Sequence, residues 1–182
     1  MIPNIFKAYD IRGLVGTELT KDFAFAVGAA FAKFLELERE PATVVIGEDM
    51  RPSSPELASA FADGVTSQGF DVIRIGLAST DMLYFAAGKL NLPGAMFTAS
   101  HNPAEYNGIK LCKSGAKPIG ETSGLNRIKE ILVNKEYKTS NNSAIQSHEN
   151  LLEKYSQFLL SLLPEFSNAE SIAQSRPLKI VI

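Results

Sequence analysis

The feature that most constrains the fold is an alternation of short apolar runs with longer amphipathic segments along residues 20–97. Residues 43–46 (TVVI), 72–75 (VIRI) and 95–97 (AMF) are short apolar runs of the kind that forms buried strands. The segments before and between them repeat apolar residues at helical spacing. This order of helices and strands predicts an open, largely parallel sheet covered by helices.

Local signals indicate where the helices begin. Thr20 is a good N-cap for a first helix, and Ser53 is expected to cap a second helix that has a proline in its first turn. A third helix is predicted over residues 80–90. All three are expected to bury one face against the sheet.

The second half of the chain adds a strand with a different direction. Asn107-Gly108 favours a tight reversal, so the strand predicted over residues 109–112 is expected to run antiparallel to a neighbour. A helix is predicted over 124–133, a polar surface loop or linker over 135–147, and an amphipathic helix over 151–162. The fold class is therefore α/β: a three-layer α/β/α domain with a mixed, mostly parallel sheet.

Composition excludes several classes of partner. The 182 residues carry a net charge of −2, so no basic surplus favours nucleic acid or an anionic membrane surface. The single cysteine, Cys112, is expected to be a small core residue on a strand, and His148 to be exposed in the linker. No apolar run is long enough for a membrane span, and we expect a cytoplasmic protein.

The richest stretch for chemistry is residues 95–111, AMFTASHNPAEYNGIKL. Ser100 directly follows an apolar strand, and ligands of open α/β sheets gather at the carboxyl ends of strands. His101, a turn at Asn102-Pro103 and Lys110 surround it. These residues mark the candidate site.

Four interpretations of Ser100 compete. A hydrolase nucleophile is disfavoured because the G-x-S-x-G elbow is missing and because the adjacent His101 is poorly placed as its base. A nucleotide-binding loop is disfavoured because neither glycine-rich phosphate motif is present. A serine that carries a phosphoryl group would need cations, which His101 and Lys110 could supply. The fourth interpretation, an ordinary turn, is about equally supported by the residue types alone.

A family resemblance favours the phosphoryl carrier. Residues 98–103 (TASHNP) with 106–110 (YNGIK) closely resemble the phosphoserine loop of the α-D-phosphohexomutases, and the match is closest to the bacterial phosphomannomutase/phosphoglucomutase group. Residues 6–13 (FKAYDIRG) resemble the opening motif of that family, and 47–54 (GEDMRPSS) resemble its G-x-D-x-R-x-S segment. The resemblance extends to about residue 165.

The resemblance implies an enzyme that interconverts hexose 6-phosphate and hexose 1-phosphate, with mannose or glucose as the sugar. Phosphorylated Ser100 would give its phosphoryl group to the substrate and form a 1,6-bisphosphate, which also serves as activator. A magnesium ion would bind to the phosphate on Ser100. Arg12 and Lys110 would contact the phosphoryl group and the reacting hydroxyl, with Lys110 as general acid/base.

Other residues receive smaller roles by the same resemblance. His101 would orient the loop or the phosphate. Tyr9 would line the site, although a half-buried packing role is about as well supported. Asp49, Arg51 and Ser53 are expected to be structural, as a loop ion pair and a helix cap.

The chain also lacks parts that the family uses. No aspartate follows Asp81, so the aspartate-rich metal loop of the second of the family's four domains is absent. Residues 178–182 (LKIVI) look like a strand that is only beginning, and an unpaired β-branched edge is a hazard at a chain end. We therefore expect a fragment that has little mutase activity alone.

The expected division of the chain has three parts. Residues 1–146 would form the core of the first domain with the phosphoserine loop, 147–176 a helix and connector, and 177–182 the first strand of a second domain. The remaining domains of the same polypeptide would be its partners. The alternative is a natural single-domain protein, a binding or regulatory module that keeps the fold and has lost the chemistry.

Overall fold

The computed structural model describes residues 5–138 and 144–162. The chain divides into two compact units, Met1–Asn150 and Leu151–Ile182. The first unit contains the sheet, and the second contains helix α5 (Leu152–Ser161), which is the amphipathic helix predicted over 151–162. The connector beyond residue 162 and the strand expected at 177–182 lie outside the described residues.

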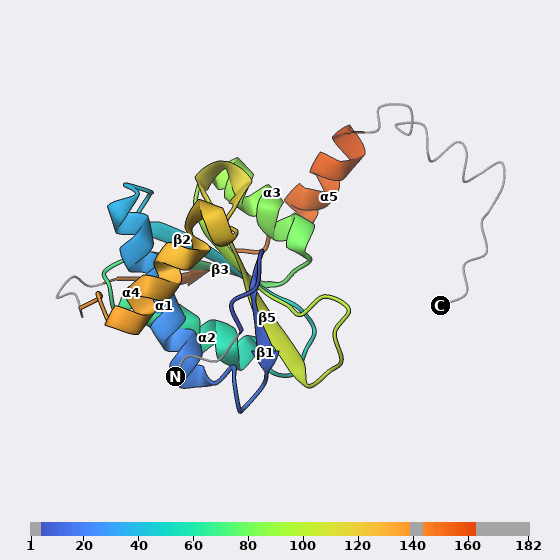
Figure 1. Cartoon of the computed structure of the whole chain (residues 1–182). Helices are drawn as coiled ribbons and strands as arrows, with labels where there is room; N and C mark the ends of the chain where they lie inside the picture. Colours follow the sequence, from blue (N-terminus) through green and yellow to red (C-terminus); the bar gives the residue numbers. More distant parts are fainter. Residues whose placement is uncertain (1–4, 139–143, 163–182) are drawn as a thin grey trace, which may run out of the picture. The chain divides into compact units, whose positions relative to one another are not determined.

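A mixed sheet forms the centre of the first unit (Figure 1). Its order is β1-β5-β4-β2-β3-β7, with β6 paired to β5. β2 pairs in parallel with β3 and β4, and β3 with β7, whereas β5 is antiparallel to β1, β4 and β6. Among the described strands β5 alone therefore runs opposite to the others, which confirms a mixed, mostly parallel sheet. The strands are β1 (Ile11–Leu14), β2 (Thr43–Glu48), β3 (Asp71–Leu77), β4 (Gly94–Phe97), β5 (Tyr106–Lys113), β6 (Lys117–Pro118) and β7 (Gln146–His148).

Helices cover both faces of the sheet, so the three-layer prediction is also confirmed. α1 (Lys21–Leu37) packs against α2 (Ser54–Thr66) and α4 (Asn126–Asn134), and the three lie together in Figure 1. α3 (Thr80–Leu90) contacts β2 and β4 from the other face, together with the short helical turn Ser114–Ala116. A second irregular turn, Glu121–Leu125, precedes α4.

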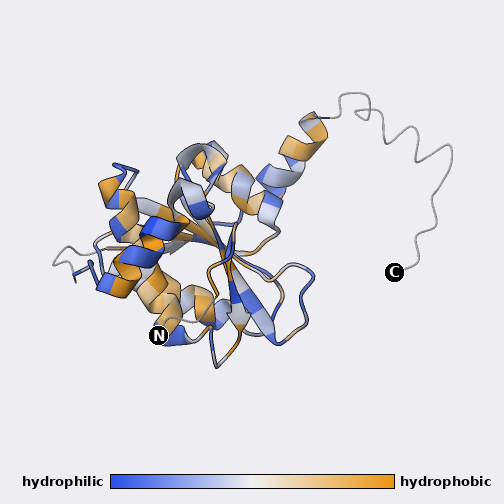
Figure 2. Cartoon of the chain, viewed as in Figure 1, coloured by the Kyte–Doolittle hydropathy of each residue, from blue (hydrophilic) through white to orange (hydrophobic). Residues whose placement is uncertain are grey.

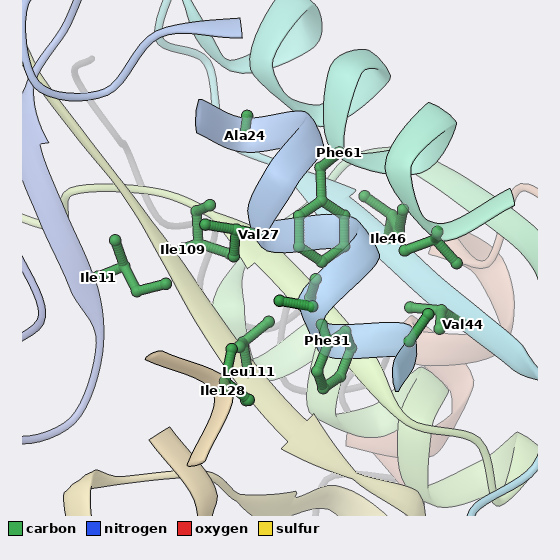
Figure 3. Close-up of a cluster of buried hydrophobic side chains, with 14 of the residues drawn as sticks. Ile11, Ala24, Val27, Phe31, Val44, Ile46, Phe61, Ile109, Leu111 and Ile128 are labelled. Atoms are coloured by element: carbon green, nitrogen blue, oxygen red, sulfur yellow. The ribbon is translucent and has the colours of Figure 1, made fainter. Parts of the chain in front are cut away.

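The larger core lies between the sheet and the α1–α2–α4 layer. Three aromatic rings cross it: Phe31 and Phe61 have centroids 6.0 Å apart, and Phe61 and Phe97 5.5 Å apart. Figure 3 shows Phe31 and Phe61 among side chains of the sheet, including Val44 and Ile109. The alternation of polar and apolar residues along α4 is plain in Figure 2, and its buried residues face this core.

α1 and α2 approach each other so closely that only glycine fits at two positions. A Cβ built on Gly28 would overlap the carbonyl oxygen of Phe61, and one on Gly64 would overlap that of Phe25. Each glycine thus lies against the backbone of the opposite helix. The close crossing fixes the start of α2 relative to the sheet, and α2 begins next to the candidate site.

The helices begin at or next to the predicted residues, but one of the predicted capping hydrogen bonds is absent. Thr20 caps α1, since its Oγ1 accepts a hydrogen bond from the amide of Phe23 at 3.1 Å. Ser53 does not cap α2, because its side chain makes no capping hydrogen bond and is used elsewhere. α3 spans the predicted residues 80–90, and its cap is Ser79.

Three strands were not expected from the sequence. β1 and β6 were unassigned, and β7 lies within and just beyond the predicted linker, where His148 is paired with Arg74 of β3. His148 is exposed and Cys112 is buried on β5, as predicted. Among the described helices, none has both the length and the apolar character that a membrane crossing requires.

Candidate active site

Ser100 lies three residues beyond the end of β4, in the connection to β5. We call residues 98–105 the serine loop. Two turns shape it, closed by hydrogen bonds from Asn102 N to Ala99 O (3.0 Å) and from Tyr106 N to Pro103 O (3.1 Å). Ser100 is exposed and has a left-handed backbone, with φ of 54°. This conformation is rare for a residue with a side chain and needs support from its surroundings.

The Asn107-Gly108 pair does not form the turn. Both residues lie inside β5, so the antiparallel direction is confirmed but the reason given for it is wrong. Asn107 is fully buried, and its Nδ2 donates to Ser53 Oγ (2.8 Å) and Ser54 Oγ (2.9 Å). A Cβ on Gly108 would lie 2.7 Å from the carbonyl oxygens of both Ile11 and Thr98. The pair therefore lets β1, β5 and the serine loop pack closely.

His101 is nearer to the serine hydroxyl than its position in the sequence suggested. Its Nδ1 lies 3.3 Å from Ser100 Oγ, within hydrogen-bond range. Which atom donates depends on the imidazole tautomer. Adjacency in the sequence therefore does not keep the imidazole from the hydroxyl.

Two cationic residues predicted for the site, Arg12 and Lys110, pair with the same carboxylate, that of Asp10. Asp10 Oδ2 lies 2.6 Å from Arg12 NH2 and 3.1 Å from Lys110 Nζ. Asp10 is 4% exposed, whereas the side chains of Arg12 and Lys110 are each 25% exposed. Arg12 is on β1 and Lys110 on β5, and these strands pair. The antiparallel pairing therefore brings residues from distant parts of the sequence into one cluster.

Asn102 joins this cationic cluster to the serine loop. Its Oδ1 accepts a hydrogen bond of 2.8 Å from Arg12 NH1. In the part of the chain that the structure describes, Arg12 Nε is buried and has no hydrogen-bond partner. Arg12 thus reaches Ser100's own loop through Asn102.

An open pocket of about 670 Å³ lies beside Ser100, at the carboxyl ends of β2, β3 and β4. Ser100 and Asn102 line it together with polar Ser79 and the exposed apolar side chains of Met50 and Leu77. Arg12 and Lys110 do not line the pocket themselves. Their link to it is Asn102, which lines the pocket and accepts from Arg12.

Tyr9 is far more exposed than the packing interpretation expected. It is 80% exposed, so the half-buried packing role is wrong. Its ring lies near Gly120, where a Cβ would be 3.5 Å from Tyr9 Cδ1. A role in lining the site stays a prediction.

Sequence reasoning missed two residues of the site. Asp10, inside the YDIRG motif, was not singled out, although an acid two residues before an arginine on one strand is a weak signal of pairing. Arg51 was expected to form a loop ion pair, and Asp49 Oδ2 does lie 3.3 Å from its Nε. Its main contacts are with the backbone of the serine loop. No pattern in the sequence indicates those contacts.

The described residues do not form a complete magnesium site. Within residues 5–138 and 144–162, no group of three or more His, Cys, Asp or Glu side chains could hold a metal ion. Two carboxylates beside the serine loop, Asp10 and Asp49, are already paired with cations. Magnesium prefers carboxylate, phosphate and water oxygens, so a phosphate on Ser100 would be one ligand among several still to be supplied.

Comparison with known proteins identifies the family. Residues 3–139 match the family model described as "Phosphoglucomutase/phosphomannomutase, alpha/beta/alpha domain I". A phosphomannomutase of Vibrio cholerae is 37% identical over 97% of this chain, and one of Klebsiella pneumoniae is 45% identical over 69% of it. The chain covers 37% of the Vibrio protein and 78% of the Klebsiella protein.

A solved structure agrees with the sequence matches. The crystal structure of a phosphoglucomutase/phosphomannomutase family protein from Burkholderia thailandensis has a TM-score of 0.75 and 32% identity, over 83% of this chain and 34% of that one. The chain thus spans a little over a third of the length of most of these relatives. The matched residues include the serine loop, the cationic cluster and the strands that carry them. The chain belongs to the phosphoglucomutase/phosphomannomutase family, whose α/β/α domain I it contains.

Proposed function

We propose that Ser100 is the phosphoryl carrier of a phosphohexomutase that interconverts hexose 6-phosphate and hexose 1-phosphate. The observation that carries this proposal is an exposed serine in a left-handed turn, on a loop tied through Asn102 and Arg12 to the Asp10–Lys110 pair. The phosphomannomutase names of the relatives support mannose, with glucose as the second sugar.

The proposed phosphoryl transfer between Ser100 and the sugar runs in both directions. Ser100 Oγ gives up its proton and attacks one phosphorus of a hexose 1,6-bisphosphate, the bond from that phosphorus to the sugar oxygen breaks, and the sugar oxygen takes up a proton. In the reverse step a sugar hydroxyl loses its proton and attacks the phosphorus on Ser100, the bond from that phosphorus to Oγ breaks, and Oγ takes up a proton. The sugar turns over between the two steps, so the phosphoryl group moves between O1 and O6. The bisphosphate is therefore intermediate and activator.

The described residues suit distinct parts of this chemistry. Arg12 is partly exposed and is held in place by Asp10 and Asn102, so it would bind a phosphoryl oxygen. Lys110 would hold or accept the proton of the reacting sugar hydroxyl, because an ammonium can give up a proton whereas a guanidinium does not. His101, 3.3 Å from Ser100 Oγ, would orient the hydroxyl or its phosphate. Tyr9 would line the substrate side.

We propose that the rest of the machinery lies in other domains of the same polypeptide. Magnesium would neutralise charge on the transferring group, with the phosphate on Ser100 as one ligand and the other ligands outside the described residues. An open pocket cannot exclude water from a sugar phosphate, so the 182-residue chain alone would have little mutase activity. The protein would act in the cytoplasm, without nucleic acid or membrane as a partner.

The experiment is a phosphoryl-transfer assay with mapping of the modified residue. The purified chain, and the full polypeptide that carries it, are incubated with glucose 1,6-bisphosphate and analysed by intact mass and peptide mapping. Ser100→Ala should abolish the label, whereas Ser156→Ala, an exposed serine on α5, should keep it.

Each outcome has a definite meaning. A phosphoryl group on Ser100 of the full polypeptide supports the proposal, and a label on the 182-residue chain as well would show that domain I accepts the group by itself. Mutase turnover with a phosphate elsewhere, or with none, would overturn the serine-carrier mechanism. No label and no turnover in the full polypeptide would favour a binding or regulatory module.

A further inference from the structure

Arg51 connects the loop after β2 to the backbone of the serine loop. Its NH1 donates to the carbonyl oxygens of Pro103 (2.8 Å) and Tyr106 (3.0 Å). Its NH2 donates to those of Ser100 (3.0 Å) and Asn102 (2.7 Å). One guanidinium thus binds four carbonyls, three in the serine loop and one at the first residue of β5.

The position of Arg51 is itself fixed by Asp49. Its Nε lies 3.3 Å from Asp49 Oδ2, an ion pair whose geometry is not that of a hydrogen bond, and its amide donates to Asp49 Oδ1 at 3.0 Å. The side chains of Arg51 and Asp49 are 11% and 13% exposed. Asp49 Oδ1 also accepts from Ser54 Oγ at 2.6 Å, at the first residue of α2.

A second set of hydrogen bonds closes the arrangement. Asn107, just after the serine loop, donates from Nδ2 to Ser54 Oγ at 2.9 Å. Ser54 is therefore hydrogen-bonded both to Asp49, which holds Arg51, and to Asn107, the second residue of β5. The side chains of the β2–α2 connection fix both the middle and the end of the serine loop.

The carbonyl contacts explain how Ser100 keeps its unusual backbone. A residue with a side chain adopts φ near +54° only where the surroundings hold it there. Arg51 binds the carbonyl of Ser100 itself and those of the second and third residues after it. Hydrogen bonds from a charged donor are stronger than neutral ones. A different backbone at Ser100 would break several of them together.

We propose that Arg51 is a positioning residue for phosphoryl transfer, an inference that rests on the proposed function. It holds the backbone of Ser100 so that Oγ points at the phosphoryl donor, and it does so without touching the phosphate. Both of its terminal nitrogens are committed to carbonyls, and its Nε is buried beside Asp49. Arg12 differs in its exposure: its side chain is 25% exposed, whereas that of Arg51 is 11% exposed.

The chain offers a matched control. Arg74 is a similarly buried arginine, 13% exposed, on the neighbouring strand β3, and its NH2 donates to Glu48 Oε2 at 2.6 Å. In the part of the chain that the structure describes, its side chain donates to Glu48 and Pro55 and not to the serine loop. Arg51→Lys and Arg74→Lys each keep the positive charge, but the single ammonium of a lysine cannot reach four carbonyls spread along a loop.

The experiment uses the full polypeptide that carries this chain. The rate of Ser100 phosphorylation by glucose 1,6-bisphosphate is measured in single-turnover mode, with the KM for hexose phosphate and the melting temperature. We expect Arg51→Lys to slow phosphorylation by about tenfold or more, as loss of alignment does, with a KM within about twofold of wild type. Arg74→Lys should leave the rate within about twofold, even where its melting temperature falls equally.

The outcomes separate this inference from the proposed function. A labelled wild type with an equally fast Arg51→Lys variant overturns the role of Arg51 and leaves the phosphoserine intact. A wild type that is never labelled at Ser100 overturns the proposed function and, with it, this role. If Arg51→Lys does not fold, Asp49→Asn releases Arg51 from its anchor while keeping its shape. A folded Asp49→Asn protein with the wild-type phosphorylation rate would then contradict the inference.

Discussion

Lys110 Nζ donates a hydrogen bond of 3.1 Å to Asp10 Oδ2, although the two residues are 100 positions apart in the chain. The same oxygen accepts from Arg12 at 2.6 Å. Asp10 has almost no exposure to solvent, so its charge is balanced by these two cations and not by water. One carboxylate therefore sets the positions of the two groups that we assign to the phosphoryl group and to the proton.

Asp10→Asn tests this arrangement because it keeps the shape and removes the charge. We expect the free energy of unfolding to fall by about 1–3 kcal/mol, less than for a fully buried pair because both cations are partly exposed. Phosphorylation of Ser100 should slow by about tenfold or more, since both cations lose their anchor. Urea unfolding and the phosphorylation assay measure the two effects. Asp22→Asn, an exposed acid on α1, is the control, and equal rates in all three proteins would contradict the assignment.

Lys110→Arg separates charge from proton transfer. The arginine keeps a positive charge next to Asp10 but cannot release a proton at neutral pH. Mutase kcat in the full polypeptide should fall by about 10²–10⁴-fold, the usual worth of a general acid/base. Lys113→Arg on the same strand, whose lysine pairs with Glu38 at 2.5 Å, should keep its activity. A Lys110→Arg enzyme with wild-type kcat would remove Lys110 from the acid/base role.

Gly28→Ala should disrupt the crossing of α1 and α2. The new Cβ would overlap the carbonyl of Phe61, and backbone cannot move aside as a flexible side chain can. We expect a loss of about 3 kcal/mol or more in the free energy of unfolding, at the upper end for overpacking. Gly88→Ala in α3 is the control: its Cβ would meet only Ala116 Cβ at 3.8 Å, so alanine's helix propensity should leave stability equal or higher. Chemical denaturation measures the free energy of unfolding of both variants. An equal loss of stability in the two would contradict the close crossing of α1 and α2.

Cys112 should be inert to thiol reagents in the folded protein. Burial raises the pKa of its thiol from about 9 to about 12. At pH 8 the sulfur is therefore protonated and out of reach of a reagent in solution. The folded state therefore holds the thiol proton more tightly than the unfolded state, and stability should decline as pH rises from about 9 towards 12. Labelling by iodoacetamide with and without urea, and unfolding curves of wild type and Cys112→Ala at pH 8 and pH 10, test both points. Fast labelling in the native protein would show that the strand is open there.

The regular part of the fold was predictable because its signals are local. The buried strands β2, β3 and β4 are apolar runs, and the helices α1 and α3 have residues typical of N-caps at or next to their predicted first residues. β1 and β7 were missed for the opposite reason. β1 is four residues long and contains Gly13, and β7 (QSH) is exposed and polar, so neither has the pattern of a buried strand. Both become strands only because a neighbouring strand offers its edge.

The candidate site divides in the same way. Ser100, His101, Arg12 and Lys110 were found from short motifs, whereas the contacts that hold them depend on the tertiary structure. Asn107 shows the difference: it belongs to a pair typical of tight turns, yet it is buried inside a strand and bonds to two serines at the start of α2. Local propensity was overridden there by packing between elements more than 50 residues apart.

The pairing of β1 with β5 has a consequence for when the site can exist during synthesis. β1 (Ile11–Leu14) is synthesised well before its partner β5 (Tyr106–Lys113), and the edge of β1 that pairs with β5 has no partner until then. At a translation rate of about 5–20 residues per second, the nascent chain waits about 5–20 seconds between the two. Lys110 can thus join Asp10 and Arg12 only after β5 has left the ribosome. Until then the cluster of Asp10, Arg12 and Lys110 is incomplete.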